Sequence, residues 1–377
     1  MKLEAIQGNQ PSTALANSRA AVNRRSFLKT CGVAAAAAGL DTDLTARVAE
    51  AVTAPGRPSV VWLHFQECTG CTETLLRTAQ PAVHELLLEL ISLDYHETLA
   101  AAAGHQLEAN LDRVLKEKEG NFILVVEGAI PTKDGGIYCK VGGHTAMDSL
   151  NRVAEKAAAI IAVGSCASFG GVAAAHPNPT GASGVPVLLE GRKVVTLPGC
   201  PPNPYNLLAT VLRFMTYGEL PELDKKGRPL FAYGRTIHEH CPRRPHFDAG
   251  RFAKAFGDEG HNEGWCLYEL GCKGPQTFAS CSTAHFCEVI GAWPIGIGHP
   301  CVGCTEEEIA FKIPLFDTVD IPTPTPGVTH APVDLELRGR NGISPLSTGF
   351  AGLVGGVLIG VAMMAARDLA KRDQLKE

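Results

Sequence analysis

The sequence predicts an α/β, flavodoxin-like, doubly wound domain, followed by a loop-rich, cysteine-rich domain and a C-terminal transmembrane helix. Three observations predict this fold class. Short apolar runs alternate with helical patterns between residues 59 and 217, Gly, Pro and Cys are frequent in residues 224–313, and no charged residue occurs from Asn341 to Ala366. Alternating strands and helices are typical of a parallel sheet covered on both faces.

Composition narrows the class of protein. The chain has 377 residues, 45% of them hydrophobic, and a net charge of −5. This length allows two or three domains, and the apolar content excludes wholesale disorder. The slightly acidic balance predicts no nucleic-acid partner, because the phosphate backbone requires a basic face. Thirteen cysteines are the unusual quantity. Disulfides, zinc and iron–sulfur clusters are the alternatives.

Residues 1–54 predict a twin-arginine signal peptide region. Arg24 and Arg25 precede a weakly apolar, alanine-rich run from Thr30 to Leu40, which is too short to span a bilayer. Twin-arginine export carries folded proteins, typically because a cofactor has already been inserted. The signal therefore favours clusters over disulfides.

The first domain, residues 55–225, should alternate strands with helices. We expect strands at 59–65, 122–126, 160–163 and 193–197, and helices at 72–93, 148–159 and 205–217. In a parallel sheet of this kind, ligands bind in the loops beyond the carboxyl ends of the strands.

Four cysteines follow strands of this predicted sheet. Cys68 and Cys71 come after the first strand, Cys166 follows residues 160–163, and Cys200 follows residues 193–197. One close pair with two distant single cysteines suits a [4Fe–4S] cluster, whereas a structural zinc site usually uses two close pairs. A thioredoxin-like Cys-x-x-Cys pair is a further alternative, but it leaves Cys166 and Cys200 without a role.

Residues 226–320 have too little apolar periodicity to build a large core. Bonds to metal should supply part of the missing stability, which makes this segment a loop-rich iron–sulfur domain. It contains seven cysteines and the run His238-Glu239-His240-Cys241. Seven thiolates with one or two imidazoles are enough for two more clusters.

The C-terminal run predicts a membrane anchor at 346–367, after a proline-rich linker at 321–345. Twenty uncharged residues from 347 to 366 form a helix about 30 Å long, the thickness of a hydrocarbon core. The positive residues behind it should keep the tail, 368–377, in the cytoplasm and the body on the periplasmic or outer face of the inner membrane. Gly352, Gly356 and Gly360 form a stripe for helix packing, unless the anchor simply faces lipid.

Five motifs follow one another in order behind the twin-arginine leader. They are Glu67-Cys68-Thr69-Gly70-Cys71, Gly164-Ser165-Cys166, Leu197-Pro198-Gly199-Cys200-Pro201-Pro202-Asn203-Pro204, His238-x-x-Cys241 and Gly298-His299-Pro300-Cys301-Val302-Gly303-Cys304. As an ordered set, they resemble the small, electron-transferring subunit of a membrane-bound, periplasm-facing [NiFe] hydrogenase. The resemblance covers almost the whole chain.

The resemblance implies three clusters with named ligands. A proximal [4Fe–4S] cluster would use Cys68, Cys71, Cys166 and Cys200; a distal [4Fe–4S] cluster would use His238, Cys241, Cys266 and Cys272; a medial [3Fe–4S] cluster would use Cys281, Cys301 and Cys304.

His240 is the fallback imidazole for the distal cluster, if His238 is not the ligand. Cys287 should be a buried thiol, and Cys139 a core or partner-facing one. Glu67 and Thr69 could relay protons beside the proximal cluster, with ordinary helix capping as the simpler alternative.

The same resemblance implies that the enzyme is a hydrogenase whose catalytic centre lies in a partner. The [NiFe] centre needs two Cys-x-x-Cys pairs, and none remains here once the clusters are formed. Electrons would leave through a membrane cytochrome b or a similar quinone-linked subunit.

Gly70 and Gly171 stand where oxygen-tolerant members of the family have extra cysteines, so the chain resembles the standard, more oxygen-sensitive type. The alternatives are an iron–sulfur subunit of another membrane-bound respiratory oxidoreductase and a disulfide-stapled, anchored surface protein.

Overall fold

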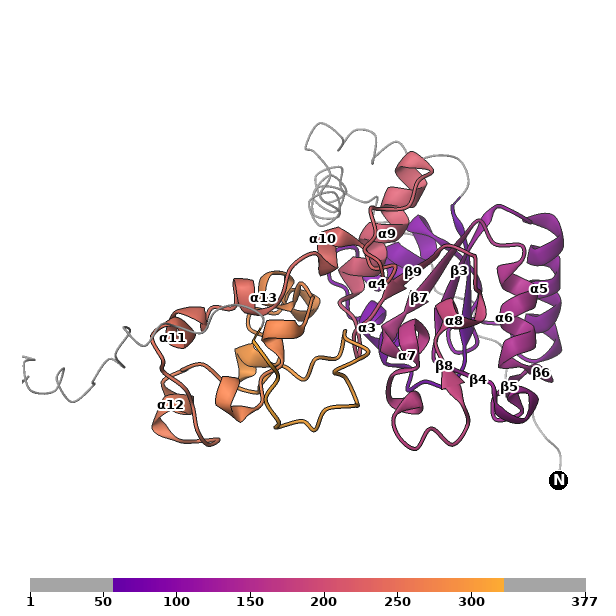
Figure 1. The fold of residues 1–377 in the computed structure, drawn as a ribbon. Helices are drawn as coiled ribbons and strands as arrows, with labels where there is room; N and C mark the ends of the chain where they lie inside the picture. Colours follow the sequence, from indigo (N-terminus) through magenta and orange to yellow (C-terminus); the bar gives the residue numbers. More distant parts are fainter. Residues whose placement is uncertain (1–56, 322–377) are drawn as a thin grey trace, which may run out of the picture. The chain divides into compact units, whose positions relative to one another are not determined.

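A five-stranded parallel sheet organises the first half of the protein in the computed structural model, which describes residues 57–321 (Figure 1). The strand order is β2-β1-β3-β7-β9, which is the 2-1-3-4-5 order of flavodoxin-like folds. The strands are β1 (Ser59–His64), β2 (Ser92–Tyr95), β3 (Phe122–Glu127), β7 (Ala159–Val163) and β9 (Val194–Leu197). Every neighbouring pair is parallel, so all five carboxyl ends meet at one edge.

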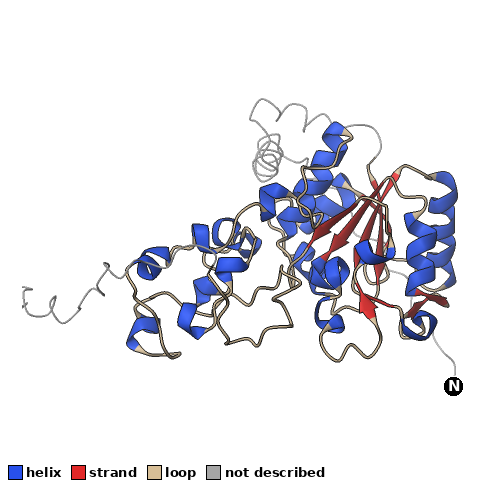
Figure 2. Cartoon of the chain, viewed as in Figure 1, coloured by secondary structure: helices blue, strands red, loops and turns tan. Residues whose placement is uncertain are grey.

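Helices cover both faces of the sheet (Figure 2). The main helices are α3 (Gly70–Leu76), α5 (His105–Glu117), α6 (Ala146–Ala154) and α9 (Pro204–Tyr217). Because alternate side chains of a strand point to opposite faces, two cores form. The first contains Val61, Leu124 and Ile160 of the sheet with Leu111 of α5 and Leu150 of α6; the second contains Trp62, Val125 and Ile161 with Leu75 of α3 and Leu207 of α9.

The four expected strands agree with the structure to within one residue at each end, but β2 was not expected, and the helix expected at 72–93 is wrong. α3 ends at Leu76 and Pro81 follows, which cannot occupy a helix interior. The chain continues through α4 (Val83–Glu85) and the π-helical η3 (Leu86–Leu90) into β2. A leucine-rich run of this length does not distinguish strand from helix by periodicity.

Two other helices differ from the expectation. α5 was not expected, although Leu107, Leu111 and Val114 form a buried stripe with helical spacing. The helix expected at 148–159 is shorter than expected, because α6 ends at Ala154 and Ala159 begins β7. α6 begins two residues earlier, where the Thr145 side chain accepts a hydrogen bond from Asp148 N and so caps the helix.

Short elements complete the first half. They are the ribbons β4 (Ile130–Pro131) with β8 (Ala182–Ser183) and β5 (Lys140–Val141) with β6 (His144–Thr145), and the helices η4 (Lys133–Gly136), α7 (Gly164–Phe169), η5 (Gly171–Ala174) and α8 (Val185–Leu188). α7 starts directly after β7, so the Gly164-Ser165-Cys166 motif lies at the carboxyl edge of the sheet.

The second half consists of short helices and loops, as the sequence predicts. Its helices are α10 (Leu230–Tyr233), η6 (His238–His240), α11 (Arg244–Asp248), α12 (Glu259–Asn262), η7 (Tyr268–Leu270), η8 (Gly274–Gln276), α13 (Cys281–Ala284), η9 (Phe286–Glu288) and η10 (Ile295–Ile297). Its small core includes two of the cysteines expected to bind iron, Cys272 and Cys301, and two more pack at its margin, Cys241 and Cys281.

A buried ion pair organises the start of the second half. Arg228 donates to Glu306 Oε1 at 2.6 Å and to Asp224 Oδ2 at 2.7 Å, and Arg228 and Glu306 are both buried. Glu306 also accepts from the backbone N–H of Phe278 at 3.0 Å. These hydrogen bonds connect the segment that follows α9 to the loops around Phe278 and Glu306.

The predicted signal with Arg24 and Arg25, nearly all of the linker, the anchor with Gly352, Gly356 and Gly360, and the tail lie outside the described residues. Between residues 57 and 321, no helix combines the length and the apolar character needed to cross a membrane.

Candidate metal centres

The carboxyl edge of the sheet carries the four cysteines of the predicted proximal set. Cys68 and Cys71 follow β1, Cys166 lies in α7 after β7, and Cys200 follows β9. Their thiols interact with one another electrostatically. Burial raises the pKa of Cys71 well above its usual value, and Glu127, Cys166, Cys68 and Cys200 raise it further. Thiols in such surroundings become thiolates only when a cation is bound beside them.

Glycines allow the backbone to come close to these sulfur atoms. A Cβ on Gly164 would lie 2.5 Å from Cys71 Sγ, and a Cβ on Gly171 would lie 2.9 Å from Cys166 Sγ. A Cβ on Gly70 would lie 3.1 Å from Cys68 Sγ. Gly70 and Gly171, the two positions singled out in the sequence, therefore both adjoin thiols of the proximal set.

The predicted medial set lies in the second half, where Cys301 is buried and Cys281 and Cys304 are partly buried. Burial raises the pKa of Cys304 to about 12, and the neighbouring Cys281 contributes the next largest part of this increase. Burial, with Cys272 and Cys304, raises the pKa of Cys301 well above its usual value. Cys304 thus interacts with both other members of its set. Cys287 is only partly buried, which differs from the buried thiol expected, and Cys139 packs at the margin of the first core.

The predicted distal set surrounds a small cavity lined by His238, Cys241, Cys266 and Cys272. Burial raises the pKa of Cys266 to about 12, and that of Cys241 to about 11. Burial lowers the pKa of His238, so its imidazole is neutral, and the buried Nε2 has no hydrogen-bond partner. An unpaired neutral nitrogen among three thiols fits a metal ligand.

His240, the fallback imidazole, is placed differently. It is exposed, and its Nε2 accepts a hydrogen bond from Arg235 Nη1 at 3.0 Å. Its nitrogen is therefore already paired. The geometry favours His238 as the imidazole of the distal set.

The three sets form a continuous series. Ser165, next to Cys166, donates to the carbonyl of Cys304 and accepts from Gly199 N at 3.0 Å. Cys304 also interacts electrostatically with Cys200, and Cys301 interacts with Cys272. Proximal, medial and distal sets therefore follow one another without a gap.

A buried carboxylate holds the first turn of α3 in place. Glu127, at the end of β3, accepts from Cys71 N at 3.0 Å, from Thr72 Oγ1 at 2.6 Å and from Trp62 Nε1 at 3.2 Å. Its side chain is buried, and the donors balance the charge. Glu127 thus positions Cys71, a role that the sequence analysis missed. A charged residue ending an otherwise apolar strand was the available signal.

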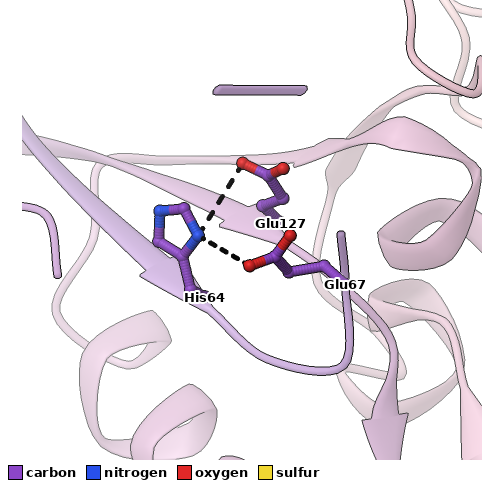
Figure 3. Close-up of side chains that lie close together, drawn as sticks. All are labelled: His64, Glu67 and Glu127. Carbon is purple, nitrogen blue, oxygen red and sulfur yellow. Dashed lines mark hydrogen bonds and ion pairs between the residues drawn. The ribbon is translucent and has the colours of Figure 1, made fainter. Parts of the chain in front are cut away.

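His64 lies between Glu127 and Glu67, with its Nδ1 facing both carboxylates (Figure 3), and His96 packs beside it. His96 Nδ1 accepts from Leu99 N at 3.2 Å, so its proton lies on Nε2, which is 3.2 Å from His64 Nε2. His64 accepts there and carries its own proton on Nδ1, which is 3.3 Å from Glu67 Oε1. Burial lowers the pKa of both histidines, that of His96 to about 3, which keeps both rings neutral.

His64, Glu67 and Glu127 also offer ligand atoms within 4.8 Å of one another. These atoms already have partners, however. Glu127 uses both oxygens on N–H and O–H donors, and the hydrogen bonds place a proton on the His64 nitrogen that faces Glu67. The group is a hydrogen-bonded network, without a lone pair free for a metal ion on His64 Nδ1.

The capping alternative for Glu67 and Thr69 is wrong. Thr69 occupies the N-cap position of α3, but its side chain makes no capping hydrogen bond. Its hydroxyl donates instead to Glu67 Oε1 at 3.2 Å. Burial raises the pKa of Glu67, against the opposing effect of this hydrogen bond, and the second oxygen of Glu67 is buried without a partner.

Two families match consecutive parts of the chain. NADH ubiquinone oxidoreductase, 20 Kd subunit, matches residues 68–214, and the C-terminal family of the NiFe/NiFeSe hydrogenase small subunit matches residues 233–317. The chain is 54% identical over 356 residues to the Hydrogenase-2 small chain of Escherichia coli K12, covering 94% of each chain. It is 45% identical to the quinone-reactive Ni/Fe-hydrogenase small chain of Wolinella succinogenes, covering 76% of this chain and 81% of that one.

A solved structure agrees with these similarities. A chain of the [NiFeSe] hydrogenase from Desulfomicrobium baculatum superposes with a TM-score of 0.65 at 35% identity, covering 70% of this chain and all of that one. The parallel-sheet α/β fold is therefore shared with a hydrogenase chain.

Replacing Gly164 with Ala should displace Cys71. The new Cβ would lie 2.5 Å from the Sγ atom, whereas real contacts of this kind are longer than 3 Å. We expect loss of the iron held by the proximal set, about four atoms per chain, measured by elemental analysis of the purified complex.

Gly120→Ala is the matched control for this variant. Gly120 has a similar positive φ of 73°, but nothing lies within 4 Å of its added Cβ. In both variants the alanine at positive φ lowers the stability of the fold by about 1–2 kcal/mol. Only Gly164→Ala should also lose iron. Equal iron content in the two variants would contradict the placement of Cys71.

Proposed function

The chain belongs to the small-subunit family of [NiFe] hydrogenases, and we propose that it relays electrons from the H₂-converting centre of its large subunit to a quinone-linked acceptor in the membrane. As a hydrogenase small subunit, it pairs with a catalytic large subunit. The observation that carries the proposal is the unbroken series of ten cysteines and one imidazole from Cys68 to Cys304.

We assign the ligands as the sequence predicts them. The proximal [4Fe–4S] site is Cys68, Cys71, Cys166 and Cys200; the distal [4Fe–4S] site is His238, Cys241, Cys266 and Cys272; the medial [3Fe–4S] site is Cys281, Cys301 and Cys304. The mutual influence of the thiols on their pKa values and the unpaired Nε2 of His238 support this grouping. No disulfide bond links the cysteines within residues 57–321, which supports metal ligation over disulfide bonds.

When bound, such clusters supply one-electron carriers. The residues of the chain decide where those carriers lie and which end meets the partner. Cys68 and Cys200 are exposed, whereas Cys272 and Cys301 are buried. The proximal set therefore opens at the surface, and we place the large subunit against it. His238, as a neutral ligand, makes the distal site less negative than four thiolates would.

The export signal and anchor, residues 1–54 and 346–367, complete the proposal. A body exported by the twin-arginine pathway would lie on the periplasmic face of the inner membrane, with the tail in the cytoplasm. The anchor would then lie beside a membrane cytochrome b or a similar quinone-linked subunit. A relative named as quinone-reactive supports a quinone as the final acceptor.

We also propose that Glu67 and Thr69 relay protons at the boundary with the large subunit. Glu67 is largely buried, and its unpaired oxygen can accept a further hydrogen bond from the partner's side. On its other side, Glu67 Oε1 faces His64 Nδ1 at 3.3 Å, and Glu97 accepts from the backbone N–H of His64 at 3.5 Å. Burial raises the pKa of Glu97 to about 7, so it can take up or release a proton near neutral pH.

Changing Cys166 to Ala should abolish H₂-dependent dye reduction by the purified heterodimer. This variant removes one of four proximal thiols, and iron analysis should show that the proximal cluster is lost. Cys139→Ala is the control, because Cys139 packs against the first core outside all three sets and should leave activity and iron unchanged. Full dye reduction in Cys166→Ala with the proximal iron absent would contradict the relay.

Changing Glu67 to Gln should slow H₂ oxidation without loss of iron. Gln keeps the shape of the side chain but cannot carry a proton, and relays of this kind contribute about 10²–10⁴-fold to a rate. Glu73→Gln is the matched control, since Glu73 is exposed and pairs with Arg77 on the surface of α3. Equal turnover in the two variants, measured with saturating dye, would exclude Glu67 from the proton path.

A further inference from the structure

Lys273 is a buried cation that the proposed relay does not yet use. Its side chain is 0% exposed, although lysine almost always reaches solvent. It lies between Cys272, a proposed distal ligand, and the loop that carries Cys301, a proposed medial ligand. Burying an ammonium is costly unless it is fully hydrogen-bonded. A role that needs the charge would explain why it is there.

Four carbonyl groups surround the Lys273 ammonium. Nζ lies 2.9 Å from Pro314 O, 3.0 Å from Leu315 O, 2.9 Å from Asp317 O and 3.3 Å from Gly271 O. Carbonyl oxygens only accept hydrogen bonds, so Nζ is the donor. The three hydrogens of an ammonium match the three shortest contacts, to Pro314 O, Leu315 O and Asp317 O, whereas a neutral amine has only two. The cage therefore offsets the effect of burial, which lowers the pKa of Lys273, and it holds the side chain in one place.

The backbone of Lys273 joins the two proposed sites. Its N–H donates to the carbonyl of Cys301 at 2.8 Å, and its carbonyl accepts from Thr277 Oγ1 at 2.6 Å. Electrostatically, Lys273 interacts with Cys301 and with Cys272. The other acidic group that faces it is Asp317, whose side chain is exposed and therefore screened by water.

Arg243 provides a contrast within the same region. It interacts with Cys241, Cys266 and Cys272, all in the distal set, and its guanidinium donates to Trp265 O at 2.9 Å. Lys273, by contrast, is also joined to the medial loop, because its backbone N–H donates to the carbonyl of Cys301 at 2.8 Å.

We propose that Lys273 is a fixed positive charge shared by the medial and distal sites, and that it raises the reduction potential of both. The inference rests on the cluster assignment of the proposed function. Reduction adds one electron, and so one negative charge, to either site. A nearby buried cation stabilises that added charge, and the low local dielectric preserves the effect. By acting on both sites at once, Lys273 would raise both potentials and leave the step between them unchanged.

The test compares variants of the purified heterodimer by redox titration followed by electron paramagnetic resonance. Lys273→Gln keeps hydrogen atoms for two of the carbonyl groups but removes the charge. We expect the ratio of oxidised to reduced centre at a fixed potential to rise about tenfold for both sites, which equals 59 mV for a one-electron couple. Lys273→Arg restores the charge and should restore both potentials.

Two further variants are controls. Arg243→Gln should lower the distal potential alone. Lys254→Gln removes an exposed charge from the same half of the protein and should change neither potential.

Every outcome of the titration decides the inference. Unchanged medial and distal potentials in a Lys273→Gln variant that retains about eleven iron atoms per chain would overturn it. If Lys273→Gln loses iron, Lys273→Met takes its place, because it removes the charge and keeps an unbranched side chain; unchanged medial and distal potentials in Lys273→Met would also overturn the inference. Iron missing from the unmodified heterodimer would instead contradict the proposed function itself.

Discussion

Thiols that raise one another's pKa are the constraint on which the rest of this structure depends. Cys71, Cys301 and Cys304 each titrate above the usual range because burial and neighbouring sulfur atoms both oppose the thiolate. Bound iron would stabilise the thiolates and would add bonds to the second half, whose apolar core is small. Other features of the fold position the cysteine side chains. The strands end at one edge, glycines let the backbone approach Sγ, and Glu127 holds the start of α3.

The sequence predicted the sheet and the proximal cysteines because both depend on local patterns. Apolar runs bounded by Gly and Pro indicate strands, and parallel strands bring the cysteines that follow them to one edge. It could not predict β2, whose leucine-rich approach also suits a helix. It also missed Glu127 and Lys273, because their partners lie far away in the sequence: Glu127 is 56 residues from Cys71. Division of the remaining cysteines into medial and distal sets needed the family resemblance, since spacing alone allows many groupings.

Buried charge changes sign along the series of cysteines. Glu67 and Glu127 lie beside the proximal set, whereas Arg243 and Lys273 lie beside the distal and medial sets. Negative neighbours disfavour an added electron and positive neighbours favour it. Together with the neutral imidazole of His238, this order favours movement of electrons from the surface where Cys68 is exposed toward the buried second half.

The most direct measurement is diffraction from crystals of the heterodimer at the iron absorption edge. The account predicts three separate anomalous peaks in this chain, one among the sulfur atoms that follow β1, β7 and β9, one beside Cys281, Cys301 and Cys304, and one next to His238 Nε2. Absence of iron signal from these positions, or sulfur–sulfur bonds between the same cysteines, would contradict it.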